Sequence, residues 1–106
     1  MIGMMENIIN EIKQHKENVN ELAREYWFKQ ATTQTMRESV ELYEKYKPRI
    51  DHLQTRQEEL IKKMETQGYG LFSYKFKRDN FGKSFYDLIV TFVFNKGFDE
   101  KTNITI

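Results

Sequence analysis

The chain has 106 residues, with 17 Lys and Arg against 16 Asp and Glu, a formal net charge of +1 and no cysteine. This length suits one small domain and excludes a cofactor-binding domain beside a separate substrate domain. The balanced charge excludes a strongly basic nucleic-acid coat and an acidic mimic of DNA. The lack of cysteine excludes a disulfide framework, a thiolate metal site and a cysteine nucleophile.

The N-terminal sequence has neither the basic region nor the uninterrupted apolar run of a secretory signal. The most apolar stretch, residues 85–94, is far shorter than the ~20 residues that a membrane-spanning helix needs. The absence of cysteine suits a reducing compartment. We therefore predict a cytoplasmic protein that does not bind membranes.

Residues 4–67 contain no glycine and one proline, and charges of both signs are interspersed among them, which is typical of helices. Apolar residues recur here at alternating steps of three and four, the spacing of a coiled-coil seam. This first seam consists of Met5, Ile8, Ile12, His15, Val19, Leu22 and Tyr26. We predict a helix over about 4–30 whose seam packs against another helix, either within the chain or between chains.

A second helix is predicted to begin at Thr35, because Thr35 and Glu38 match the capping box, in which each side chain satisfies a free backbone N–H. Its apolar series is Met36, Val40, Tyr43, Lys47, Ile50, Leu53, Gln57, Leu60 and Met64. The phase of this series changes between Ile50 and Leu53, just after Pro48. We therefore expect the second helix to be kinked or broken near Pro48, and Gly68 and Gly70 to close the helical part at about residue 67.

After Gly70 the apolar period changes to two, which is typical of strands. A first strand is predicted over 71–77, a longer one over 84–95 and a short third one over 103–106. The predicted fold class is α+β, in which an N-terminal antiparallel helical hairpin or coiled coil is followed by a two- or three-stranded antiparallel β-meander at about 69–106. Both parts belong to a single domain, 1–106.

The second predicted strand is apolar on both of its faces. One face carries Tyr86, Leu88, Val90, Phe92 and Phe94, and the other carries Phe85, Asp87, Ile89, Thr91 and Val93. A strand of this kind normally has both faces covered, whereas one layer of helices covers only one. We therefore predict that Phe85, Ile89 and Val93 form an exposed apolar face that a second copy or another protein covers.

The sequence offers little for catalysis or metal binding. The only histidines are His15 and His52, and neither the ExxH nor the HExxH spacing is present. His15 lies in the first seam one turn after Glu11, so a polar residue that fixes helix register is favoured over a metal ligand. The serines lack a GxSxG context, and a glycine-rich phosphate loop is absent. We predict no catalytic residue, no metal and no cofactor, and hence no enzyme.

A basic and aromatic strip at 74–83 is the strongest local feature of the second half. Its cations are Lys75, Lys77, Arg78 and Lys83. They can contact phosphates while an aromatic side chain stacks on a base. However, strand alternation places the lysines opposite Tyr74 and Phe76, so solvated charges that discourage edge-to-edge pairing are the simpler interpretation. An acidic protein partner is the third hypothesis.

Three consecutive aromatic residues, 26–28, end the first predicted helix. They cannot all face one seam, so at least one points elsewhere. Trp27 is either part of a binding hot spot or packed on the sheet, and we expect packing on the sheet.

These patterns favour a non-catalytic module that binds proteins: an adaptor, assembly or regulatory subunit, homodimeric or of higher order, that also binds another protein. The residues predicted to carry association are Ile12, Val19, Leu22, Tyr26, Trp27, Phe85, Ile89 and Val93. The alternative is a small nucleic-acid-binding regulator that uses the strip 74–83, whose phosphate contacts would weaken steeply with salt. Chaperone subunits, kinetochore-type adaptors and small accessory proteins of phages and secretion systems share such an architecture, but a fold does not carry a function.

Overall fold

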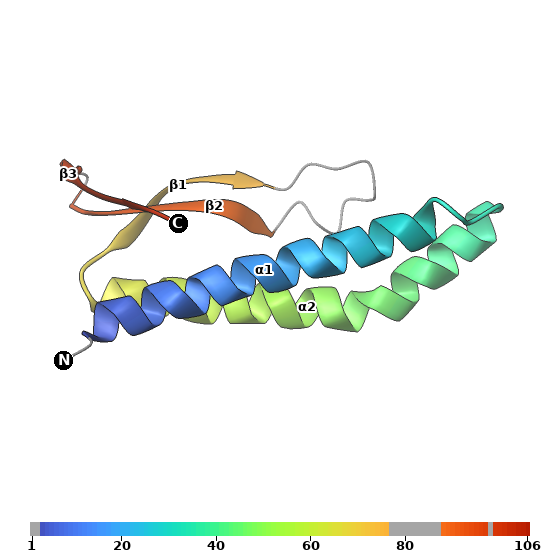
Figure 1. Cartoon of the computed structure of the whole chain (residues 1–106), viewed down its shortest axis with the longest axis horizontal. Coiled ribbons are helices and arrows are strands. Elements are labelled where there is room, and N and C mark those ends of the chain that lie inside the picture. The colour runs from blue at the N-terminus through green and yellow to red at the C-terminus, as the bar shows by residue number, and fades with distance from the viewer. Residues whose placement is uncertain (1–2, 77–87, 98) are drawn as a thin grey trace.

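The computed structural model describes residues 3–76, 88–97 and 99–106 and has two long helices followed by an antiparallel sheet (Figure 1). Helices α1 (Met4–Gln30) and α2 (Met36–Thr66) form a hairpin. Strands β1 (Gly70–Phe76), β2 (Ile89–Lys96) and β3 (Asp99–Thr105) follow, in the spatial order β1-β2-β3. The predicted α+β class, a helical hairpin followed by a β-meander, is confirmed.

Helix α1 buries the seam that its spacing predicts. Its buried residues are Ile8, Ile12, His15, Val19, Leu22, Ala23 and Tyr26. The charged residues between them face solvent or the flanks of the hairpin, so the helix presents a narrow apolar stripe to α2. The helix bounds agree with the predicted range.

The seam of α2 has no change of phase, so this part of the prediction is wrong. Tyr46 is only 2% exposed and takes the place expected of Lys47, which is exposed. From Tyr46 the buried positions continue at alternating steps of four and three through Ile50 to Met64. The Tyr46 hydroxyl donates a hydrogen bond to Glu25 at 2.9 Å. A tyrosine fits this position because its ring is buried while its one polar group reaches the edge of the hairpin.

Helix α2 begins as its sequence predicts and continues through its proline. The Thr35 hydroxyl accepts a hydrogen bond from the Glu38 N–H at 3.1 Å. The Glu38 carboxylate accepts a hydrogen bond in return from the Gln34 N–H at 2.8 Å. In the capping box this donor is normally the N–H of the N-cap residue, here Thr35. Pro48 lies inside the helix, whose axis bends about its middle (Figure 1). A bend is the predicted effect of a missing backbone donor, but a second helix start at Pro48 is excluded.

Replacing Thr35 with Ala should lower the free energy of unfolding by about 1 kcal/mol, because the cap of α2 loses its side-chain acceptor. Urea denaturation followed by circular dichroism measures the change. Thr35→Ser is the matched control, since serine keeps the hydroxyl and should unfold close to the wild type. Equal stability of the Ala and Ser variants would contradict the role of this cap.

Gly68 ends α2, as predicted, in the left-handed conformation with φ +85°. The Gly68 N–H donates to the Glu65 carbonyl at 2.9 Å, and the Tyr69 N–H donates to the Met64 carbonyl at 3.0 Å. This pair of bonds is the Schellman motif, which needs a residue with positive φ at its turn. It directs the chain from the helix into β1.

The sheet agrees with the predicted meander in order but differs in length and register. β3 starts at Asp99, four residues before the strand predicted at 103–106, because Gly97 (φ +56°) reverses the chain tightly after β2. The pairing continues to the last residue, since Phe92 and Ile106 exchange backbone hydrogen bonds of 3.0 and 2.8 Å. β2 starts at Ile89, and the predicted strand residues 84–87 lie outside the described residues.

The sheet packs on the half of the hairpin that contains the start of α1 and the end of α2 (Figure 1). One core cluster joins both helices to the sheet and consists of Ile8, Ile12, Leu60, Met64, Ile89, Phe92, Phe94 and Ile106. A second cluster fills the hairpin further along and consists of Val19, Leu22, Ala23, Tyr26, Tyr46, Ile50, Leu53 and Leu88. The first cluster thus joins the sheet to both helices, and the second lies mainly between the helices.

Candidate functional site

The predicted association residues of the first seam lie inside the hairpin. Ile12, Val19, Leu22 and Tyr26 are at most 2% exposed, and all four pack within the core clusters that contain residues of α2. The helices thus pair within the chain, one of the two arrangements that the sequence leaves open. In this conformation the four side chains stabilise the fold and are not available to another chain.

The three residues predicted to form an exposed sheet face do not form one patch. Ile89 is 4% exposed and packs in the core, so its expected place on the outer face is wrong. The physical reason is a register shift: Thr91 pairs with Lys75 but Ile89 pairs with Phe76, so β2 has one extra residue there, which reverses the side on which Ile89 points. Val93 is partly exposed, and Phe85 lies outside the described residues.

The basic strip falls largely outside the part of the chain that the structure describes. Lys75 belongs to β1, where its backbone pairs with Thr91. Lys77, Arg78 and Lys83 lie in the undescribed stretch 77–87. The hypothesis of nucleic-acid contact therefore stays a prediction.

A buried polar pair lies where the hairpin meets the sheet. His15 is 2% exposed, its ring lies edge-on to that of Phe92 at 6.4 Å, and within the described residues neither ring nitrogen has a hydrogen bond. Burial lowers the pKa of His15 below its usual value of 6.5, the Arg56 charge lowers it further, and the adjacent Gln57 side chain acts in the opposite direction. Gln57 also accepts a hydrogen bond of 2.7 Å from the Ile89 N–H and so holds the start of β2 against α2.

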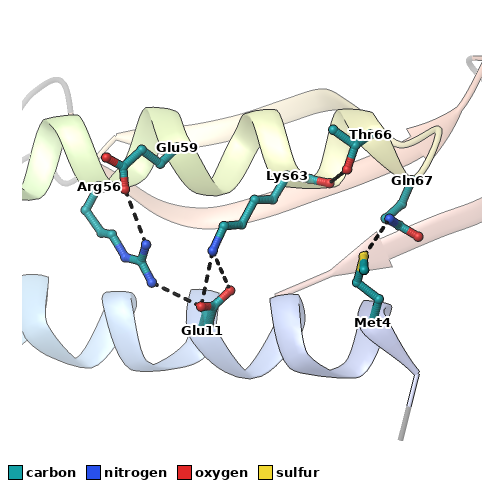
Figure 2. A network of polar contacts seen from close by, with 7 residues as sticks. All are labelled: Met4, Glu11, Arg56, Glu59, Lys63, Thr66 and Gln67. Atoms are coloured by element: carbon teal, nitrogen blue, oxygen red, sulfur yellow. Dashed lines mark hydrogen bonds and ion pairs between the residues drawn. The ribbon is translucent and has the colours of Figure 1, made fainter.

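A row of ion pairs follows the flank of the hairpin that faces away from the sheet (Figure 2). The Glu11 carboxylate accepts hydrogen bonds from Arg56 at 3.3 Å and from Lys63 at 3.2 Å. The bond to Lys63 is the main reason that the pKa of Glu11 lies below its usual value. Two helical repeats of seven further along, Glu25 pairs with Arg49 at 3.0 Å. These flanking pairs align the antiparallel helices, but partly exposed pairs stabilise a fold only weakly.

The same flank has an open hollow of about 660 Å³ between the helices. Its polar lining includes Glu21, Arg49 and His52, and Arg49 already binds Glu25. Within residues 3–76, 88–97 and 99–106, no three His, Asp or Glu side chains come close enough to hold a metal ion. The predicted absence of a metal and of catalysis thus stays a prediction.

The end of the hairpin far from the sheet has exposed apolar side chains. We call them the tip residues, and they are Trp27 (50% exposed), Phe28 (73%), Met36 (84%) and Val40 (49%). Of the aromatic triplet only Tyr26 is buried, and its ring lies edge-on to that of Tyr46 of α2 at 5.4 Å. Phe28 is largely exposed, so at least one of the three points elsewhere, as predicted. The packing of Trp27 on the sheet stays a prediction. In Figure 1 the tip extends past the strands.

The sequence patterns include the tip residues but do not predict their exposure. Met36 and Val40 belong to the predicted seam of α2, and spacing does not show that this seam continues past the end of α1. The strongest indication was the aromatic triplet, of which Trp27 was a predicted interaction residue. Phe28, Met36 and Val40 were missed as candidates for binding.

The fold and its exposed tip define an α+β protein made of a helical hairpin and a β-meander. Comparisons with protein-family models, curated proteins and solved structures found no match for this chain. In the described part of the chain, neither helix is long and apolar enough to cross a membrane.

Proposed function

We propose that this protein is a non-catalytic interaction module, an adaptor or assembly subunit that binds proteins, including copies of itself, through the tip of its helical hairpin. A single observation carries this proposal. Six large apolar side chains are exposed among the described residues, and four of them are the tip residues. Single exposed apolar residues are ordinary, but a group of them at one end is typical of an interaction surface.

The energetics support a binding role for the tip. Fully burying one large apolar side chain contributes about 1.5 to 3 kcal/mol, and several buried together offset part of the entropy that association loses. Trp and Phe are also residue types enriched at interfaces. The four tip residues belong to neither of the two core clusters, whereas Tyr26 and Tyr46 belong to the cluster inside the hairpin. We place this role in the cytoplasm because the chain has no cysteine.

Site-specific photo-crosslinking in the cells that make the protein tests this proposal. The photoreactive residue p-benzoylphenylalanine replaces Phe28 or Met36 in the full chain. The matched control has the same residue in place of Met4, which is 65% exposed and lies at the opposite end of α1. We expect crosslinked protein adducts, to any partner, from the tip positions and few from position 4. Equal yields at all three positions would contradict a binding role of the tip.

A further inference from the structure

Two arginines on the flank of the hairpin that faces away from the sheet reach in opposite directions. Arg56 binds Glu11 at 3.3 Å, toward the start of α1 (Figure 2). Arg49, one heptad earlier on α2, binds Glu25 at 3.0 Å, and its guanidinium lies 5.2 Å from the centre of the Tyr46 ring, toward the tip. Glu11 and Glu25 are about 20 Å apart along α1 at 1.5 Å per residue. The two ion pairs therefore leave the layer between them open.

The hollow of about 660 Å³ lies in this middle layer. On α1, Asn18 is one heptad from each of the two glutamates, and its side chain is shorter than theirs. On α2, the proline of the bend lines the hollow with a compact ring. Leu22 and Leu53 of the hairpin core lie at its base. The volume is within the range of ligand sites, about 300 to 1,000 Å³.

One negative charge at the edge of the hollow has no counterion. Glu21 lines the α1 side, and among the residues that the structure describes it forms no ion pair. Glu25 differs, because Arg49 and the Tyr46 hydroxyl both donate hydrogen bonds to its carboxylate. The same contact neutralises Arg49. The hollow thus combines an unmatched carboxylate with an apolar base, which favours an occupant with an apolar stem and a positively charged end.

An arginine side chain fits this description better than a lysine side chain. Its planar guanidinium forms two parallel hydrogen bonds to one carboxylate and also stacks on aromatic rings, whereas the lysine ammonium acts as a point charge. The hollow offers both kinds of partner, since Glu21 lines its α1 side and His52 its α2 side. Arginine is also one of the residue types that contribute most to binding at protein interfaces.

We infer that this hollow binds the side chain of an arginine in a partner protein, with the guanidinium on Glu21 and the stem on Leu22 and Leu53. The hollow is open along the flank, so a side chain that projects from another protein can enter it. None of its described lining residues belongs to the tip. The inference therefore goes beyond the proposed function and does not depend on it.

NMR titration of the full chain, labelled with ¹⁵N, tests this inference. The probe is the capped peptide acetyl-Ala-Ala-Arg-Ala-Ala-amide, added from about 0.1 to 50 mM. We expect saturable chemical-shift changes at the amides of Leu22, His52 and Leu53, with a Kd of about 1 to 10 mM, as suits a single bound side chain. The matched control peptide has citrulline in place of arginine, which keeps the shape and removes the charge, and it should bind at least about fivefold more weakly.

Variants of the chain test the site itself. Glu21→Gln should raise the Kd of the arginine peptide at least about fivefold, because it removes the charge that the guanidinium binds. Glu6→Gln is the matched control, since it removes the same charge from an exposed position near the start of α1 and should leave the Kd unchanged. Asn18→Trp should abolish binding, because a large ring then fills the hollow. Circular dichroism shows that each variant is folded.

Shifts that do not saturate, or that saturate alike with the arginine and citrulline peptides, would overturn the inference, and so would a Glu21→Gln variant that binds like the wild type. Free L-arginine distinguishes a small molecule from a protein as the source of the guanidinium. It should bind more weakly than the peptide, whose flanking backbone adds contacts at the edge of the hollow. Tighter binding of free arginine would show that a protein partner is wrong. The crosslinking at the tip is a separate measurement, so failure here leaves the proposed function standing.

Discussion

Replacing Phe92 with Ala should lower the free energy of unfolding by about 3 to 5 kcal/mol, the cost of removing a large aromatic side chain from a packed core. Phe92 is fully buried at the centre of the layer between sheet and helices. Its ring stacks on that of Phe94 at 5.8 Å and meets the edge of His15 at 6.4 Å. Two rigid helices and a paired strand surround it, so the cavity cannot collapse easily. Urea denaturation measures the loss.

Phe28→Ala is the matched control for this prediction, because the same side chain is removed from a 73% exposed position on α1. At low protein concentration this control should change the stability by no more than about 0.5 kcal/mol. If Phe92→Ala costs no more than Phe28→Ala, the sheet does not pack on the hairpin as described.

The stability of the protein should fall as the pH drops below about 6.5, with a slope of up to about 1.4 kcal/mol per pH unit. The cause is His15, whose pKa is lowered mainly by burial. In the folded state His15 takes up its proton only at a lower pH than in the unfolded chain, where a histidine titrates near pH 6.5. Because the unfolded state binds more protons, stability is complete above the unfolded pKa and is lost as the pH falls toward the folded one.

His15→Leu should abolish this slope just below pH 6.5, since it removes the group that titrates. The slope, not the stability at pH 7, is the quantity to compare. His52→Gln is the control, because His52 is exposed on α2 and its replacement leaves the buried histidine in place. Lowered pKa values of Glu11 and Glu25 also reduce stability in acid, but only below about pH 4.5. A wild-type protein with flat stability from pH 6.5 to 5 would contradict this account of His15.

Local patterns predict the helices well and the details of their packing less well. The steps of three and four in the first seam predict Met4–Gln30 correctly, because a helix that buries one stripe requires that spacing. In α2, Lys47 was expected in the seam, but Tyr46 occupies it. Pro48 suggested a break in phase, whereas a proline bends a helix without changing which residues face inward.

In the sheet, too, the local pattern predicts the element correctly but not which of its residues are buried. Alternation along 84–95 predicts a strand that is apolar on both sides. Of this segment the structure shows strand β2 from Ile89 onward. However, alternation assumes a regular ladder, and the extra residue of β2 before Thr91 turns Ile89 into the core. A bulge of this kind arises from the pairing with β1 and has no local pattern of its own.

The sequence by itself determined which segments are helices, the order of helices and strands, and where α2 begins and ends, because caps, glycines and apolar periods act over a few neighbouring residues. Only the tertiary structure decided that the helices pair within the chain, that Tyr46 and Ile89 are buried and that Met36 and Val40 are exposed. These outcomes depend on the relative lengths and registers of elements far apart in the chain, and a residue is buried only where another element reaches it.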